Sequence, residues 1–108
     1  MTDSREKILV VCPGRGSYTH SELGYLRRHH GARTDLLGQF DEIRRAGGQP
    51  TITALDGSTG FDTELHGCSE HASGLTYACS YADFRAIDPD RYQIVAITGN
   101  SLGWYSAL

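Results

Sequence analysis

The chain has 108 residues, a length that suits one domain at most. Hydrophobic residues make up 39% of it, which is enough to build a core and argues against a disordered chain. Asp and Glu number 13 against 10 Lys and Arg, so the formal charge is −3. This mildly acidic balance argues against a nucleic-acid binder and against a polybasic membrane-surface segment. Residues 1–7 are polar and no apolar run has membrane-spanning length, so we expect neither nucleic acid nor a membrane as partner.

The cysteines and histidines indicate neither a disulfide framework nor a metal site. The three cysteines are Cys12, Cys68 and Cys79, an odd number without a CxxC pair, which favours a reducing, cytoplasmic location. His66-x-Cys68-x-x-His71 contains metal-ligating residue types, but a zinc site needs a second pair of ligands. We therefore expect no metal, and we expect Cys12 to be a small core residue.

The first predicted element is a strand over residues 8–12. Ile8-Leu9-Val10-Val11-Cys12 is a continuous apolar run without alternation, which is typical of a strand buried on both faces of a parallel sheet. Pro13-Gly14-Arg15-Gly16-Ser17 follows and ends the strand. We expect Ser17 to cap the helix that comes next.

Two helices are predicted in the following segment. The first covers residues 19–30, with Leu23 and Leu26 on one face and a basic end that we interpret as solvated. The second begins at Thr34, its expected cap, and ends at Gly47. Its predicted apolar stripe consists of Leu36, Leu37, Phe40 and Ile43. Residues 51–55 then predict a short strand, and residues 56–68 a turn and a loop.

A third helix is predicted over residues 69–87, and a second strand over residues 92–98. The helix has a stripe of mostly small residues at helical spacing: Ala72, Leu75, Cys79, Ala82 and Ala86. Asp88-Pro89-Asp90 ends it. The strand, Tyr92-Gln93-Ile94-Val95-Ala96-Ile97-Thr98, is again an apolar run that indicates burial in a parallel sheet. The fold class is therefore α/β, a parallel sheet flanked by helices.

The second strand leads into a pattern that predicts a nucleophile elbow. In Gly99-Asn100-Ser101-Leu102-Gly103, a Gly-x-Ser-x-Gly pattern follows a strand and opens a helix, which is the context that an elbow requires. The glycines allow close backbone approach, and the helix N-terminus directs free N–H groups at the serine. Ser101 is thus the candidate nucleophile, and the backbone N–H of Leu102 the first candidate oxyanion donor. The alternative is a glycine-rich turn that merely reverses the chain.

The loop after the first strand supplies the second candidate donor. In a parallel sheet, the loops after neighbouring strands gather at one carboxyl edge. We therefore expect Gly14 and Gly16 to hold the backbone N–H of Arg15 near Ser101. The loop has neither the GxxxxGK[ST] pattern nor a complete GxGxxG, which argues against a phosphate or dinucleotide site.

These paired motifs resemble the malonyl-CoA:acyl-carrier-protein transacylase family and the acyltransferase domains of fatty-acid and polyketide synthases. The resemblance implies an α/β-hydrolase-like core with a small ferredoxin-like subdomain inserted later in the chain. It also implies a ping-pong reaction in which serine takes malonyl from coenzyme A and passes it to the phosphopantetheine thiol of an acyl carrier protein. It implies no metal or redox cofactor, with the coenzyme A thioester as substrate. In this resemblance Ser101 is the nucleophile, and the amides of Leu102 and Arg15 form the oxyanion hole.

The chain departs from the family pattern at four positions. Arg15 and Tyr18 stand where the family usually has Gln, Asn100 where it has His, and Trp104 where it has Glu. Backbone roles survive such changes, but the identity of the acyl group stays open. Trp104 and Tyr105 either shape an acyl or pantetheine pocket or pack structurally.

A serine needs a base, and in α/β-hydrolases the base follows the serine in the sequence. Ser101 is followed by only seven residues here. In addition, a parallel sheet of only two or three strands cannot have both faces covered and its edges protected. We therefore expect residues 1–108 to be the N-terminal part of a longer catalytic domain, inactive alone. The family's catalytic His and malonyl-binding Arg are then expected after Leu108. His20, the upstream histidine nearest the loop, is expected on the surface.

Two other functions share these sequence features. One is an esterase or thioesterase built on the same elbow, in which water accepts the acyl group. The other is a non-catalytic pseudoenzyme or docking module that keeps the elbow geometry. For the transferase, Arg27 and Arg28 are the candidates for contacting an acidic carrier protein.

Overall fold

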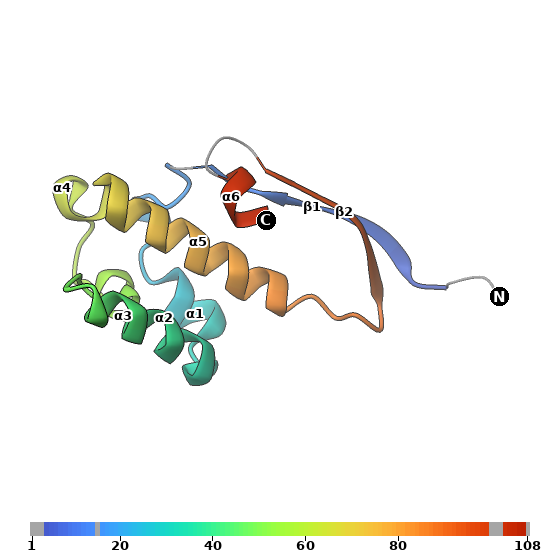
Figure 1. Ribbon diagram of the computed structural model, residues 1–108, viewed down its shortest axis with the longest axis horizontal. Helices are drawn as coiled ribbons and strands as arrows, with labels where there is room; N and C mark the ends of the chain where they lie inside the picture. Colours follow the sequence, from blue (N-terminus) through green and yellow to red (C-terminus); the bar gives the residue numbers. More distant parts are fainter. Residues whose placement is uncertain (1–3, 15, 100–102, 108) are drawn as a thin grey trace.

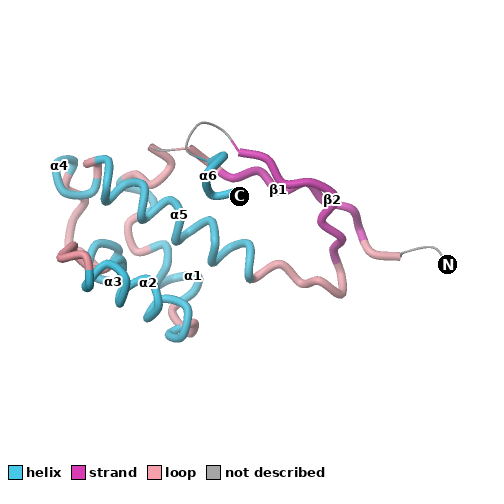
Figure 2. Tube along the Cα trace, in the orientation of Figure 1, coloured by secondary structure: helices cyan, strands magenta, loops and turns pink. Residues whose placement is uncertain are grey.

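Two strands from opposite ends of the chain pair to form the sheet, and the helices between them form a separate layer (Figures 1 and 2). The computed structural model describes residues 4–14, 16–99 and 103–107. The chain is a small α/β protein whose elements in order are β1 (Glu6–Cys12), η1 (His20–Glu22), α1 (Tyr25–His30), α2 (Thr34–Ala46), α3 (Ile52–Asp56), α4 (Thr63–His66), α5 (Ser69–Arg85), β2 (Tyr92–Gly99) and α6 (Gly103–Ala107). None of the described helices is long and apolar enough to cross a membrane.

Strands β1 and β2 are parallel neighbours. Their register runs from Glu6 opposite Tyr92 to Cys12 opposite Gly99, with an irregularity between Ile8 and Leu9. Both predicted strands and their parallel arrangement are therefore confirmed. The register brings the carboxyl ends of the two strands side by side, and this is where both motif loops begin.

The prediction that both strands are buried on two faces is wrong. Leu9 and Val11 of β1 are 57% and 60% exposed, and Val95 and Ile97 of β2 are 55% and 40% exposed. Alternate residues of a strand point to the same side, so Leu9 and Val11 mark an open face of β1. Apolar runs record the tendency of side chains to be buried, but burial also requires a covering element. Among the described elements, packing leaves these four side chains only partly covered.

The core lies among the helices rather than at the sheet. Its largest fully buried side chains include Leu26 of α1, Leu55 of α3 and Leu75 of α5. The predicted stripe of α5 is buried at Ala72, Leu75 and Ala82, whereas Ala86 is exposed. In the stripe of α2, Leu36 is buried, Leu37 and Phe40 pack against the core, and Ile43 is 72% exposed.

Three local predictions differ from the structure for identifiable reasons. Residues 51–55 do not form a strand: Thr51 caps α3 by accepting a hydrogen bond from the Ala54 N–H, and the helix buries Ile52 and Leu55. The predicted loop contains α4, which Asp62 caps at its N-terminus. The helix predicted over 19–30 is divided at Gly24, whose φ of 84° is left-handed.

Candidate functional site

The loop after β1 and the start of α6 touch at the carboxyl edge of the sheet. Gly103, the first residue of α6, is buried, and a β-carbon built on it would overlap the carbonyl oxygen of Cys12. The same β-carbon would lie 2.9 Å from the carbonyl oxygen of Pro13. Only glycine fits such a close approach. The last glycine of the Gly-x-Ser-x-Gly pattern therefore has a steric role, which is to let α6 begin directly against the end of β1.

The loop over residues 13–17 is closed by a serine. The Ser17 hydroxyl and backbone N–H both donate to the carbonyl oxygen of Gly14, at 2.7 and 3.3 Å. Gly16 has a φ of 95°, a conformation that favours glycine. The expected helix-capping role of Ser17 is wrong. The hydroxyl and N–H of Thr19 instead bond the Glu22 carboxylate at the start of η1.

The structure brings together the frame of the predicted site, while its central residues lie outside the described part of the chain. Gly14 and Gly16 belong to the loop that follows β1. This loop begins at the same sheet edge at which Gly99 ends β2, and Gly103 begins α6 there. Arg15 and residues 100–102, the last being Asn100, Ser101 and Leu102, lie outside the described residues. The side chains of Trp104 and Tyr105 lie outside them as well.

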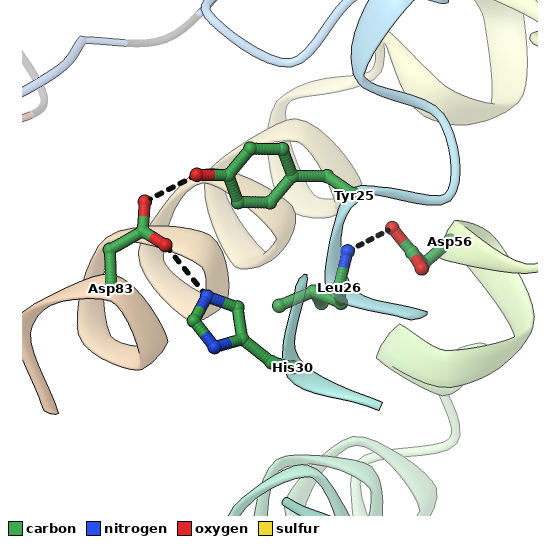
Figure 3. A network of polar contacts seen from close by, with 5 residues as sticks. All are labelled: Tyr25, Leu26, His30, Asp56 and Asp83. Atoms are coloured by element: carbon green, nitrogen blue, oxygen red, sulfur yellow. Dashed lines mark hydrogen bonds and ion pairs between the residues drawn. The ribbon is translucent and has the colours of Figure 1, made fainter. Parts of the chain in front are cut away.

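A buried carboxylate anchors the segment that follows the loop. The Tyr18 hydroxyl donates to Asp56 at 2.7 Å, and the same carboxylate accepts the N–H groups of Leu26 at 3.2 Å and Arg27 at 3.1 Å. Figure 3 shows the Leu26 contact. Asp56, which is only 3% exposed, thus caps α1 from another helix. Burial, followed by the hydrogen bond to Asp56, raises the pKa of Tyr18 well above its ordinary value.

Sequence reasoning assigned Asp56 to a turn and missed this role. Its hydrogen-bond partners lie about thirty residues or more away along the chain. No local spacing signals such a contact. The one feature that points to it is Gly24 at the cap position of α1, because glycine has no side chain to accept the free N–H groups.

A cavity of about 360 Å³ lies between β1 and α5, beside the frame of the site. Its lining includes Val10 to Pro13 from β1 and the loop, together with Thr76, Ser80 and Asp83 from α5. Thr76 is 2% exposed, and neither its hydroxyl nor that of Ser80 has a hydrogen-bond partner among the described residues. Most buried hydroxyls are paired, so these two buried oxygens are exceptions to the usual pattern.

Asp83 joins α1 to α5 at the wall of this cavity. One carboxylate oxygen accepts the Tyr25 hydroxyl and the other contacts His30 Nε2, both at 2.7 Å (Figure 3). Burial, and secondarily the bond to Asp83, raises the pKa of Tyr25 to about 12. Burial, with added repulsion from Asp56 and Asp83, raises the pKa of Cys79 to about 12. Cys79 therefore lines the cavity as a neutral thiol rather than as a reactive thiolate.

The histidines do not assemble a metal site. His66 is 1% exposed, and its Nδ1 accepts the N–H of Asp62 at 2.9 Å, so its Nε2–H donates to the Leu55 carbonyl at 2.9 Å. His71 bonds a backbone carbonyl, and Cys68 is an exposed residue that precedes α5. No cluster of three or more potential ligands occurs among the described residues.

The remaining predicted positions have simple environments. Cys12 is buried, which confirms its placement in the interior, and His20 is exposed as expected. Arg27 and Arg28 are both exposed on α1, and the Arg28 guanidinium donates to the Leu23 carbonyl at 2.5 Å.

Comparison of the chain with protein-family models, with curated proteins and with solved structures gave no match.

Proposed function

We propose that the chain carries the nucleophile elbow of an acyltransferase. Ser101 takes an acyl group, malonyl or a related one, from coenzyme A and passes it to the phosphopantetheine thiol of an acyl carrier protein. The observation that carries the proposal is the contact of Gly103 with the backbone of Cys12 and Pro13. This contact joins the two motif loops at one sheet edge, which is what an oxyanion hole made from both loops requires.

The reaction has two balanced steps. The Ser101 hydroxyl oxygen attacks the thioester carbonyl, the carbon–sulfur bond breaks, and coenzyme A leaves as the thiol with the serine proton. The carrier thiol then attacks the acyl-serine ester, the carbon–oxygen bond breaks, and the serine recovers a proton. Each tetrahedral intermediate carries an oxyanion, which the N–H groups of Leu102 and Arg15 stabilise in this proposal. A general base is needed in both steps.

The direct test is an acyl-transfer assay on the protein purified in the form that the cell produces. The protein is incubated with malonyl-CoA or butyryl-CoA, and the acyl adduct on Ser101 is sought by peptide mass spectrometry. An acyl carrier protein is then added, and the acyl group is followed to the carrier thiol. We expect a Ser101 adduct that the carrier discharges, and neither event in Ser101→Ala.

The same experiment separates the competing functions. Discharge of the adduct to water at the same rate with and without carrier would identify an esterase or thioesterase. If the wild-type protein is folded by circular dichroism and yet forms no Ser101 adduct, this would support the non-catalytic docking module and overturn the proposal. Ser58→Ala is the matched control, because the Ser58 hydroxyl bonds the Ala54 carbonyl and belongs to neither motif loop.

A further inference from the structure

Another cavity lies at the amino ends of the strands, away from the motif loops. Its volume is about 390 Å³, which is within the size range of small-molecule sites. Its described lining comes from Arg5 before β1, from the end of α5 and the loop after it, and from the first residues of β2. Figure 1 shows the end of α5 and the start of β2 at the opposite end of the sheet from α6. This cavity is therefore separate from the frame of the candidate site.

The wall of this cavity is mostly apolar. Phe84 lies near the end of α5, Ile87 follows the helix, and both line the cavity together with Tyr92 and Ile94 of β2. All four side chains are half-buried, so each keeps some apolar surface exposed to water. Contact with a hydrocarbon chain would remove that surface from water, which is favourable.

Two arginines line the same cavity. Arg5 and Arg85 are among its described lining residues, whereas none of those residues is Asp or Glu. The Arg5 guanidinium donates to the Pro89 carbonyl oxygen at 2.9 Å, which holds it against the wall. The Arg85 guanidinium donates to the Tyr81 hydroxyl at 3.1 Å and lies 5.8 Å from the centre of the Tyr81 ring. Both positive charges are thus held in place by contacts within the chain.

Arg85 has N–H groups to spare for a ligand. A guanidinium carries several N–H donors in one plane, and the bond to Tyr81 uses one of them. None of the described carboxylates forms an ion pair with Arg85. An arginine fork matches the two oxygens of a carboxylate, and bonds of this kind are stronger than those between neutral groups.

The charges beyond the lining do not cancel this preference for an anion. Arg91 adds a further positive charge, since its guanidinium lies 5.3 Å from the centre of the Tyr92 ring. The acidic residues nearest in the sequence or across the sheet are Glu6, Asp88 and Asp90, which are all exposed. The Asp88 carboxylate accepts the backbone N–H of Asp90 at 2.9 Å, and none of the three residues lines the cavity.

We propose that this cavity binds a carboxylate attached to an apolar chain, of the kind found in a medium-chain fatty acid. The Arg85 guanidinium bonds the carboxylate, Arg5 adds positive charge at the same cavity, and the wall formed by Phe84, Ile87 and Ile94 contacts the chain. This inference goes beyond the proposed function, which does not involve this end of the sheet.

The test compares three ligands that share an octyl chain: octanoate, 1-octanol and octylamine. Their affinities for the full chain are measured at neutral pH by titration calorimetry, and the place of binding by backbone amide shifts in NMR spectra. We expect octanoate to bind about three- to tenfold more tightly than octanol, because hydrogen bonds to charged groups are the stronger ones. Octylamine should bind more weakly than octanol, and acetate, which lacks the chain, more weakly than octanoate. The largest amide shifts should occur at Phe84, Ile87 and Ile94.

The variants are Arg85→Gln, which removes the charge, and Arg85→Lys, which keeps it. Arg85→Gln should reduce the octanoate-to-octanol affinity ratio toward one, whereas Arg85→Lys should retain part of the preference. Arg45→Gln is the matched control, because Arg45 is likewise an exposed arginine in the last turn of a helix, α2, and does not line the cavity. A general loss of folding would weaken binding of both ligands, so their ratio isolates recognition of the carboxylate.

The outcomes decide the proposal without reference to Ser101. A preference for octanoate that Arg85→Gln removes and Arg45→Gln keeps supports it. Equal affinity for octanoate and octanol, tighter binding of octylamine, a preference that Arg85→Gln leaves intact, amide shifts confined to other parts of the chain, or no binding of octanoate overturns it. Each of these results leaves the acyl-transfer proposal to its own test.

Discussion

The Tyr18 hydroxyl bonds the buried Asp56 carboxylate at 2.7 Å, and this joins the segment after the first motif loop to the helical core. The same carboxylate caps α1 through the N–H groups of Leu26 and Arg27. One acidic side chain thus determines both where α1 begins and where the chain leaving the loop is held. The position of the motif loop depends in this way on a residue that is remote in sequence from both motifs.

Asp56→Ala removes the acceptor for these three donors. We expect the free energy of unfolding to fall by about 2–4 kcal/mol, because a helix cap is lost and the Tyr18 hydroxyl is left unpaired. Urea denaturation followed by circular dichroism measures this. Asp35→Ala is the control, since the Asp35 side chain is 71% exposed and pairs with a partly exposed Arg33, so its loss should lower stability much less than Asp56→Ala does. Equal losses in the two variants would contradict the anchoring role of Asp56.

Gly103→Ala tests the contact between the two loops. The new methyl group would overlap the Cys12 carbonyl, so either the backbone shifts or the free energy of unfolding falls by about 1–3 kcal/mol. Gly38→Ala is the matched control, because Gly38 lies inside α2 with no atom within 4 Å of an added β-carbon. Alanine is the better helix former, and this control should gain about 0.5–1 kcal/mol. If Gly103→Ala proved as stable as Gly38→Ala, the close approach at the elbow would be refuted.

His66→Leu tests the structural role of a buried histidine. Leucine cannot accept the Asp62 N–H or donate to the Leu55 carbonyl, and each group left unpaired costs about 1–3 kcal/mol. Thermal denaturation should show a lower midpoint for His66→Leu, whereas the exposed His20→Leu should change stability by less than about 0.5 kcal/mol. Zinc or a chelator should leave the midpoint of the wild-type protein unchanged. A stabilising effect of zinc that His66→Leu abolishes would show that His66 binds metal.

Alkaline pH should destabilise the protein through groups that are buried in their neutral forms. Burial raises the pKa of Cys79 from 9.0 to about 12 and that of Tyr25 from 10.0 to about 12. Because the folded protein favours the protonated forms, their contribution to stability is complete below about pH 9 and decreases as the pH rises from there toward 12. Urea denaturation between pH 8 and 11 should show this loss. Cys79→Ala should show a smaller loss, and Cys68→Ala, at an exposed cysteine, should behave as wild type.

Features that depend on local sequence could be predicted without the structure. Strands β1 and β2 contain apolar runs that end at Pro13 and Gly99, and α5 has a stripe at helical spacing, so each could be identified from neighbouring residues. Their parallel pairing and the shared edge of the two motif loops also followed, because adjacent parallel strands end on the same side. The sequence therefore predicted the frame around the candidate site.

Features that depend on distant partners could not be predicted. Residues 51–55 have the apolar alternation of a strand, yet Thr51 caps a helix there because Ile52 and Leu55 can then both enter the core. The role of Asp56 depends on N–H groups that only tertiary packing brings to it.

The sequence alone determined where apolar side chains occur and at what spacing, since strand and helix periodicity act over a few residues. Only the tertiary structure decided which of them are covered: Leu75 is fully buried, whereas Val11 is 60% exposed. The tertiary structure also decided which polar groups are paired, because hydrogen bonds need atoms within about 3 Å. Distances of that kind are set by how the helices pack and not by spacing along the chain.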